Sequence, residues 1–317
     1  MKRIGYIALL LFCCSACKLS TPVMKLLIKA SYKNLPVSTI VEDYANRIGV
    51  PYVENGEPEQ VLDVFYANPE NRKDAVVIDI HGGFYIAGKR EFNRIFAEVF
   101  LKEGFDVVLV EYRLNDRVRD VSDELRDCAV ALDYLSVHAE ELGLNKDRMF
   151  LTGDSAGGHL ALYMAEGAGN PSMPVRPEVF KPLGVLINCP AYDFGQYGEA
   201  DGYTEDFKAW FVGPRYKDKE YLASLSPRTF VGSYAGPLFL STCTNDFIRT
   251  ESLKLKADCD ALGREIVFVD IASEDKKVGH VHNVTDPNLP ESREVNAAMI
   301  AFMDDTICSS PLSAGLP

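Results

Sequence analysis

Short apolar segments alternate with longer, amphipathic segments over most of this chain. Strands are expected at residues 61–66, 75–80, 106–110, 149–153, 183–188, 237–242 and 265–271. Helices are expected at residues 91–103, 122–142, 155–166, 251–262 and 291–307. Short strands that alternate with helices of about ten residues or more form mainly parallel sheets, covered by helices on both faces. The pattern therefore predicts a single α/β domain over residues 22–310.

Residues 189–236 interrupt this alternation. The stretch is rich in tyrosine, aspartate and glycine, holds Trp210, and is too long for a plain connection between two elements. We interpret it as an insertion. Together with residues 22–58, it is expected to form a lid over one edge of the sheet.

The first residues, MKRIGYIALLLFCCSACKLS, have the layout of an export signal. A basic start precedes an apolar run from Ile4 to about Cys14, which is too short to span a bilayer, and small residues follow. We expect a signal peptide or lipoprotein leader over residues 1–17, lipid attachment at Cys17, and a protein that is exported or associated with the cell envelope. The alternative is an apolar helix that packs on the body of a cytoplasmic protein.

The cysteines beyond this leader are odd in number and widely spaced. They are Cys128, Cys189, Cys243, Cys259 and Cys308. They show neither a CxxC pattern nor a cysteine–histidine ligand spacing, so the sequence indicates neither a disulfide framework nor a metal site. We expect small core residues. Free thiols of this kind are unusual in an oxidising compartment, which argues against export.

The chain is acidic, with 33 basic and 46 acidic residues and a net charge of −13. This charge repels nucleic-acid phosphates and anionic lipid, so no nucleic-acid partner is expected. No block of like charge stands out, and the excess is consistent with a solvated acidic surface.

The stretch Gly153-Asp154-Ser155-Ala156-Gly157 fits the pattern G-x-S-x-G between an expected strand and an expected helix. Glycines on both sides allow the tight, strained turn that lifts a serine hydroxyl above the carboxyl ends of the strands. Free amides at the start of the helix would face negative charge that develops there. The motif predicts Ser155 as a nucleophile. The alternative is a glycine-rich helix start with a capping serine.

A second glycine-rich turn, HGGFYIAG, begins at His81, directly after the strand expected at residues 75–80. A glycine pair after a strand lets the backbone turn and present N–H groups to a substrate oxygen. When such a turn lies about 70 residues before a nucleophile elbow, it supplies one half of an oxyanion hole. The N–H of Ala156 supplies the other half.

A serine nucleophile needs a histidine base oriented by a carboxylate, in the chain order serine, acid, histidine. Three histidines are unsuitable, because they precede the serine or point away from it in its own helix: His81, His138 and His159. His280 and His282 remain, in a polar loop after the last expected strand. We prefer His280, because Gly279 frees its backbone and an extended H-V-H segment points the two rings in opposite directions. His282 would then pack or hydrogen-bond nearby.

The acid is expected in the loop after the preceding strand. Asp246 lies there, just before the next expected helix, and Glu251 is the alternative. Taken alone, Asp246 could also be a turn or helix-capping residue.

These motifs resemble the hormone-sensitive-lipase-like branch of the α/β-hydrolases, which includes acetyl hydrolases and carboxylesterases. HGGFYIAG is similar to the family's H-G-G-G-F-x-x-G, EYRLND to its Y-R-L-A-P-E, and GDSAGGHLA is almost unaltered. TNDFIRTESLKL and GHVHNV are similar to its acid and histidine segments. The resemblance covers about residues 60–305. It implies the α/β-hydrolase fold and a serine esterase that uses no cofactor or metal and acts on short acyl or acetyl esters of a small molecule.

The sequence departs from this family at two places. Phe84 stands where the family has a third glycine. The oxyanion amides of this turn would be those of Gly83 and Phe84, or those of Gly82 and Gly83, with Ala156 as the partner on the helix. The side chain of Phe84 is expected to narrow the acyl side of the pocket. The family's A-P-E is replaced by NDR, and the sequence does not show the consequence.

The predicted function is hydrolysis of carboxylic esters through an acyl-enzyme, with Ser155, Asp246 and His280 as the triad. An amide hydrolase, such as an arylformamidase or a peptidase, is the alternative, because the chemistry up to the acyl-enzyme is shared. A third possibility is an inactive binding protein on the same fold. An inactive binding protein has no need to keep a serine, an acid and a base in this chain order, and all three are present here.

Overall fold

The computed structural model describes residues 43–116, 118–195 and 212–310, together with residues 26, 30, 37–39 and 209. The predicted leader over residues 1–17, its lipid site at Cys17, and Trp210 lie outside the described residues. Within the described ranges, no helix is both long enough and apolar enough to cross a membrane.

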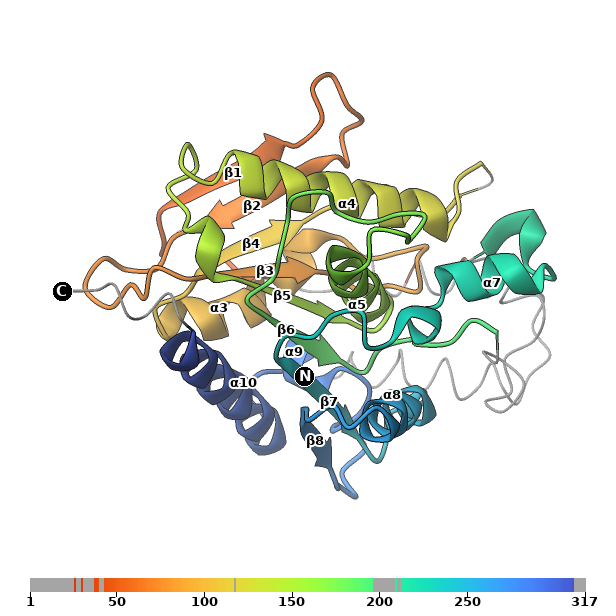
Figure 1. Cartoon of the computed structure of the whole chain (residues 1–317). Helices are drawn as coiled ribbons and strands as arrows, with labels where there is room; N and C mark the ends of the chain where they lie inside the picture. Colours follow the sequence, from red (N-terminus) through yellow and green to blue (C-terminus); the bar gives the residue numbers. More distant parts are fainter. Residues whose placement is uncertain are drawn as a thin grey trace.

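The described residues form one eight-stranded sheet in the order β1-β2-β4-β3-β5-β6-β7-β8 (Figure 1). Its strands are β1 (Asn46–Pro51), β2 (Val61–Phe65), β3 (Val76–Ile80), β4 (Asp106–Val110), β5 (Met149–Asp154), β6 (Gly184–Asn188), β7 (Leu238–Cys243) and β8 (Val267–Ile271). The pairs β1–β2 and β2–β4 are antiparallel, and all the other neighbours are parallel. The predicted mainly parallel sheet is confirmed, and the seven expected strands lie within two residues of their predicted bounds.

The first strand, β1, was not predicted. Residues 22–58 are expected to contribute to a lid, whereas β1 lies within this range and forms the antiparallel edge of the sheet, with Arg47 opposite Val64. Its residues are exposed or half-buried. An edge strand that buries little apolar surface leaves a weak hydrophobic pattern in the sequence. The lid prediction is therefore wrong for residues 46–51.

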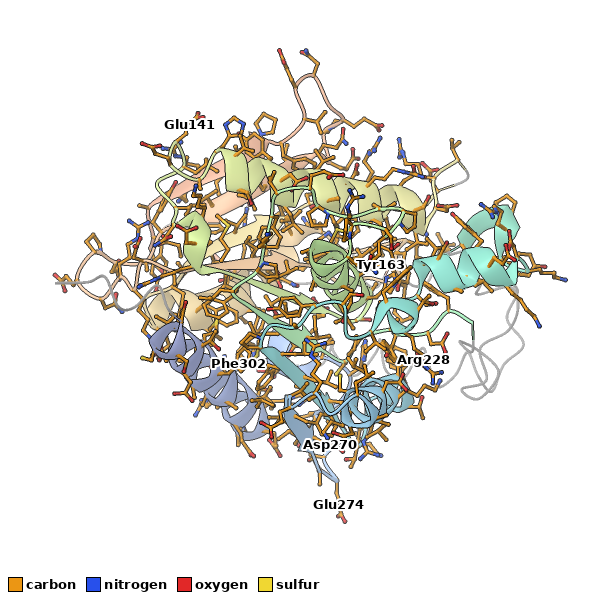
Figure 2. The ribbon with its side chains drawn as sticks, in the orientation of Figure 1. Glu141, Tyr163, Arg228, Asp270, Glu274 and Phe302 are labelled. Atoms are coloured by element: carbon orange, nitrogen blue, oxygen red, sulfur yellow. The ribbon has the colours of Figure 1, made fainter. Side chains whose placement is uncertain are left out.

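Helices cover both faces of the sheet (Figure 1). They are α3 (Arg94–Lys102), α4 (Val121–Val137), α5 (Ala156–Gly169), α7 (Lys219–Leu225), α8 (Arg249–Ala261), α9 (His282–Thr285) and α10 (Pro290–Ser309), with 3-10 turns η2 (Arg90–Asn93), η3 (Lys146–Arg148), η4 (Gly213–Arg215) and η5 (Pro227–Phe230). Ile78 of β3 belongs to the core under α4, α5 and α8, and Val77 to the core under α3 and α10. On the second face, the ring of Phe302 lies 5.8 Å from that of Phe239 (Figure 2). Because both faces are covered, the parallel strands are mostly apolar, with buried acidic residues such as Asp79 and Asp106 as exceptions.

The helix α4 ends earlier than predicted. Its last residue is Val137, whereas the hydrophobic pattern extends to Leu142. Residues 138–142 form turns that place Leu142 and Leu144 in the core, which is why the apolar pattern continues beyond the helix. Gly143 takes the predicted left-handed conformation, with φ of 67°.

The described part of the insertion over residues 189–236 packs on α5 and α8. Tyr163 of α5 donates a hydrogen bond of 2.8 Å to the carbonyl of Ser224. Arg228 of η5 binds Asp258 of α8 at 2.8 Å (Figure 2). A lid over the site stays a prediction, because part of the insertion lies outside the described residues.

The prediction that the cysteines are core residues holds for four of the five. Cys128, Cys189, Cys243 and Cys259 are buried free thiols, whereas Cys308 is exposed. Cys308 lies in the last turn of α10, on a side of the helix that faces solvent. The prediction is wrong for this residue.

Candidate active site

The four predicted site segments follow parallel strands. The HGG turn follows β3, Ser155 follows β5, Asp246 follows β7 and His280 follows β8. Strands β3, β5, β6, β7 and β8 are parallel neighbours, so their carboxyl ends lie at the same edge of the sheet. Ligands of α/β sheets bind at this edge.

Ser155 lies on a strained turn between β5 and α5. Its φ of 55° and ψ of −118° place a non-glycine residue in a sparsely populated backbone region. A Cβ on Gly157 would come within 2.0 Å of the carbonyl oxygen of Ile80, and one on Gly153 within 2.4 Å of the carbonyl oxygen of Gly157. Only glycine fits at these two positions. The predicted strand–turn–helix elbow is present, and Ser155 is 8% exposed.

The structure joins the predicted acid and base directly. Nδ1 of His280 lies 2.6 Å from Oδ1 of Asp246. Burial alone would raise the pKa of Asp246, but the charge of His280 and hydrogen bonds from His280, the Ile248 amide and the Thr242 hydroxyl lower this pKa below its ordinary value. The carboxylate is therefore ionised and holds the proton of His280 on Nδ1.

The other ring nitrogen of His280, Nε2, is buried and has no hydrogen-bond partner among the described residues. The structure thus leaves Nε2 without a bond to Ser155. Catalytic hydrogen bonds are often long before substrate binds, so this geometry does not remove His280 as the base. Phe247 flanks the ring, with 4.3 Å between ring centroids.

Two further histidines are held by other partners. His159 Nε2 lies 2.8 Å from the carbonyl oxygen of Leu225, and His282 Nδ1 lies 2.9 Å from the hydroxyl of Ser292. Burial lowers the pKa of each ring to about 4. Both are neutral core residues at pH 7, as expected for histidines that pack rather than react.

The alternative acid, Glu251, also has other partners. Its Oε2 accepts hydrogen bonds from the amides of Tyr192 and Asp193, at 3.2 and 2.9 Å, and its Oε1 binds Lys254 at 2.6 Å. Glu251 therefore holds the start of the insertion, and Asp246 is the carboxylate that binds His280.

The HGG turn decides between the two predicted sets of oxyanion amides. The amide of Gly82 donates to Oδ1 of Asp154 at 3.1 Å, so it is not available to a substrate, and the prediction that includes Gly82 is wrong. The amide of Gly83 has no acceptor among the described residues. Gly83 has φ of 138°, and a Cβ there would come within 2.0 Å of the carbonyl oxygen of Ala87. Gly83, Phe84 and Ala156 remain as the predicted donors.

Known families and solved structures include relatives of this chain. The model of the BD-FAE family matches residues 62–256. The chain belongs to the BD-FAE family. A BD-FAE match over these residues includes the HGG turn, the serine elbow and the acid loop. It confirms the predicted resemblance to esterases of the α/β-hydrolase fold.

Curated relatives match shorter stretches of this BD-FAE chain. Lipase 2 of Moraxella sp. is 33% identical over 114 residues, which cover 36% of the chain and 24% of that lipase. The acetyl esterase of Salmonella schwarzengrund is 30% identical over 99 residues, which cover 31% of the chain and 30% of that esterase. The matches thus span about a quarter to a third of these relatives.

Solved structures match over nearly the full length. An inhibited esterase B from Lactobacillus rhamnosis has a TM-score of 0.78 and 26% identity, and the match covers 91% of this chain and 94% of that one. An esterase from Pyrobaculum calidifontis has a TM-score of 0.69 and 21% identity, with 91% and 94% covered, which supports the fold alone.

In this BD-FAE protein, the EYR segment fixes the HGG turn, a role that the sequence did not reveal. Glu111 Oε1 lies 3.1 Å from His81 Nε2. The ring of Tyr112 stacks on that of His81 at 4.4 Å, and the Tyr112 hydroxyl donates to the His81 carbonyl at 2.6 Å. The conjunction of the two motifs in one sequence was the signal that could have predicted this contact.

The NDR segment also supports the HGG turn. The amide of Asn115 donates to the carbonyl of Tyr85 at 2.8 Å and to the buried carboxyl of Glu124 at 3.1 Å. Asp116 accepts hydrogen bonds from the amides of Val118 and Arg119, at 2.7 and 2.9 Å, which closes a local turn. Asn115 of this segment therefore holds the residues that follow Gly83 in place.

Two buried carboxyl groups share one amide behind the elbow. Nδ2 of Asn93 donates to Asp79 Oδ2 at 2.8 Å and to Asp154 Oδ1 at 2.9 Å. Burial, with a smaller contribution from the nearby charge of Asp154, raises the pKa of Asp79 to about 8. Asp79 is therefore protonated at neutral pH, which avoids two buried negative charges at this position.

We expect Asp79→Asn to make the folded protein less sensitive to alkaline pH. The folded state keeps a proton on Asp79 from the ordinary value of about 4 up to about 8, and unfolding releases it, so wild-type stability falls as pH rises through this window. Asparagine keeps an acceptor for Asn93 and does not titrate. The measurement is the free energy of unfolding in urea at about pH 5.5 and about pH 8. Equal pH dependence of the two proteins would contradict the assignment.

Proposed function

We propose that this protein is a serine hydrolase of carboxylic esters, with Ser155 as nucleophile, His280 as base and Asp246 as the residue that orients the base. The observation that carries the proposal is the 2.6 Å contact between His280 and Asp246, at the sheet edge where Ser155 stands on its strained turn. The substrate would be a small-molecule ester.

In the proposed reaction, the Ser155 oxygen attacks the ester carbonyl while Nε2 of His280 takes its proton. Asp246 stabilises the resulting imidazolium through the Nδ1 proton. The tetrahedral oxyanion accepts hydrogen bonds from the amides of Gly83, Phe84 and Ala156. Each such donor typically contributes about 3 kcal/mol to lowering the barrier. His280 then protonates the leaving alcohol, and water, activated by the same ring, releases the acid from Ser155.

We propose that the part of the pocket that binds the acyl chain of the ester is short. The ring of Phe84 stacks on that of Phe247 at 5.9 Å, and Phe247 in turn contacts the His280 ring. This aromatic pair links the oxyanion turn to the acid loop and occupies space beside the reacting atoms. Acetyl esters, and other short acyl esters, are the class that such a wall would accept.

We expect Phe84→Gly to extend the range of acyl chains. The residue has φ of 58°, which glycine adopts without strain, and the substitution restores the glycine of the family motif. Removing the ring should raise the ratio of kcat/KM for decanoyl over acetyl esters by about tenfold or more. Phe84→Ala, which removes the ring but keeps the strained backbone, is the matched control. An unchanged ratio in both variants would contradict the proposal that the Phe84 ring limits the length of the acyl chain.

A substrate panel tests the function itself. Purified protein is assayed on acetyl, butyryl and decanoyl esters and on formyl and peptidyl amides, with Ser155→Ala alongside. Hydrolysis of short esters that Ser155→Ala lacks supports the proposal. Preference for amides would support an amide hydrolase. If neither class were hydrolysed, the result would support an inactive binding protein on the same fold.

A further inference from the structure

Three side chains that can ligate a metal ion converge at the proposed acid and base. Cys189 follows β6, Asp246 follows β7 and His280 follows β8, and one ligand atom of each lies within 4.8 Å of the others. The amide of Val281 donates to Cys189 Sγ at 3.5 Å, which holds the sulfur beside the histidine loop. The sequence does not indicate this cluster, because its members come from three separate loops and show no ligand spacing.

We propose that Cys189, Asp246 and His280 form a binding site for a thiophilic divalent cation such as Zn²⁺, and that this cation inhibits the hydrolase. Cysteine sulfur, histidine nitrogen and carboxylate oxygen are the ligands that zinc takes in proteins. Ligand atoms around one tetrahedral zinc lie about 3–4 Å apart. The widest pair of the cluster, within 4.8 Å, needs to close by about 1 Å at most, and the 2.6 Å contact between His280 and Asp246 needs to open slightly. An exchangeable water would fill the fourth position.

The charges balance in the bound state. The carboxylate of Asp246 carries one negative charge, and the thiolate of Cys189 supplies a second. A cysteine ligates a metal ion as the thiolate, so the cation must displace the thiol proton of Cys189 into solvent. Binding therefore releases one proton and leaves a neutral complex at a buried position, which avoids the cost of an uncompensated charge.

Access to the cluster is from the side of the histidine. Cys189 is 1% exposed and the Asp246 side chain is 0% exposed, whereas the His280 side chain is 13% exposed. The cation would therefore arrive at the imidazole first and reach the sulfur behind it.

Loss of the catalytic base follows from either mode of histidine ligation. If Nδ1 binds the cation, its proton moves to Nε2, which can then no longer accept the proton of Ser155. If Nε2 binds the cation, the lone pair that serves as the base is itself occupied. Inhibition rests on the proposed function, whereas cation binding does not.

Binding is tested with Co²⁺, which shows thiolate-to-metal charge-transfer absorption in the near ultraviolet when a cysteine ligates it. We expect this absorption in the wild type and in Ser155→Ala, and its loss in Cys189→Ser and Cys189→Ala. Cys243→Ser is the matched control, because Cys243 is a nearby buried thiol that donates to the Gly279 carbonyl at 3.3 Å. It should keep the absorption.

Inhibition is tested with Zn²⁺ and an acetyl ester, and each protein is normalised to its own rate without metal. We expect inhibition of the wild type that EDTA reverses, and a zinc requirement at least about tenfold higher in both Cys189 variants. A wild type without the cobalt absorption, or inhibition that persists unchanged in the Cys189 variants, would overturn the proposal. The Co²⁺ result in Ser155→Ala stands even if the protein proves not to be an esterase.

Discussion

Replacing Ser155 with alanine is expected to reduce kcat for an acetyl ester by about 10⁶-fold, the scale of loss found when the nucleophile of a serine triad is removed. Alanine cannot attack the carbonyl, and only the oxyanion amides and substrate binding remain to accelerate attack by water. The measurement is steady-state hydrolysis at saturating substrate, with far-ultraviolet circular dichroism to confirm folding.

The matched control for this experiment is Ser252→Ala. Ser252 is a fully buried serine on α8 whose hydroxyl has no hydrogen-bond partner among the described residues. Removing that hydroxyl should leave kcat close to that of the wild type. If Ser155→Ala kept more than about a hundredth of the wild-type rate, the nucleophile would have to be another residue.

Asp246→Asn is expected to reduce kcat by about 10⁴-fold. In the proposed mechanism, the carboxylate holds the proton of His280 on Nδ1 and stabilises the imidazolium that forms during attack, whereas the amide of asparagine would hold the ring in the wrong tautomer. The Thr242 hydroxyl and the Ile248 amide can still bind the asparagine oxygen, so the loop should keep its shape. The measurement is kcat over a range of pH, together with thermal unfolding.

Glu251→Gln separates the two candidate acids. Glutamine keeps an oxygen for the amides of Tyr192 and Asp193, and among the described residues Glu251 forms no hydrogen bond with His280. We expect this variant to retain most of its activity. A large loss in Glu251→Gln together with a small loss in Asp246→Asn would reverse the assignment.

The sequence alone predicted the central sheet well. Most strands of this sheet are short, mainly apolar runs separated by amphipathic helices, and this pattern located seven strands. It failed where burial is weak, at the exposed edge strand β1, and where burial continues without a helix, at Leu142 and Leu144. The hydrophobic pattern of a sequence indicates which residues are buried. It indicates secondary structure only where a buried segment is also a regular helix or strand.

Chain order and motif limited the choice of candidate site residues. Elimination among five histidines led to His280, and the structure pairs it with Asp246. Contacts between distant loops were beyond reach. The bond from the Gly82 amide to Asp154 removed one predicted oxyanion donor, and neither this bond nor the approach of Cys189 to the pair has a signature in the sequence.

The single carboxyl group of Asp154 has a consequence for how such a protein can diverge. Its Oδ1 accepts hydrogen bonds from the Gly82 amide and from the Asn93 side chain. The residue before Ser155 is thus bonded directly to the HGG turn. A substitution that shifts either the HGG turn or the Ser155 turn alone would misalign these two turns. New substrate specificities should therefore arise by substitutions at positions such as Phe84 and Phe247, while the hydrogen bonds of Asp154 to Gly82 and Asn93 are retained.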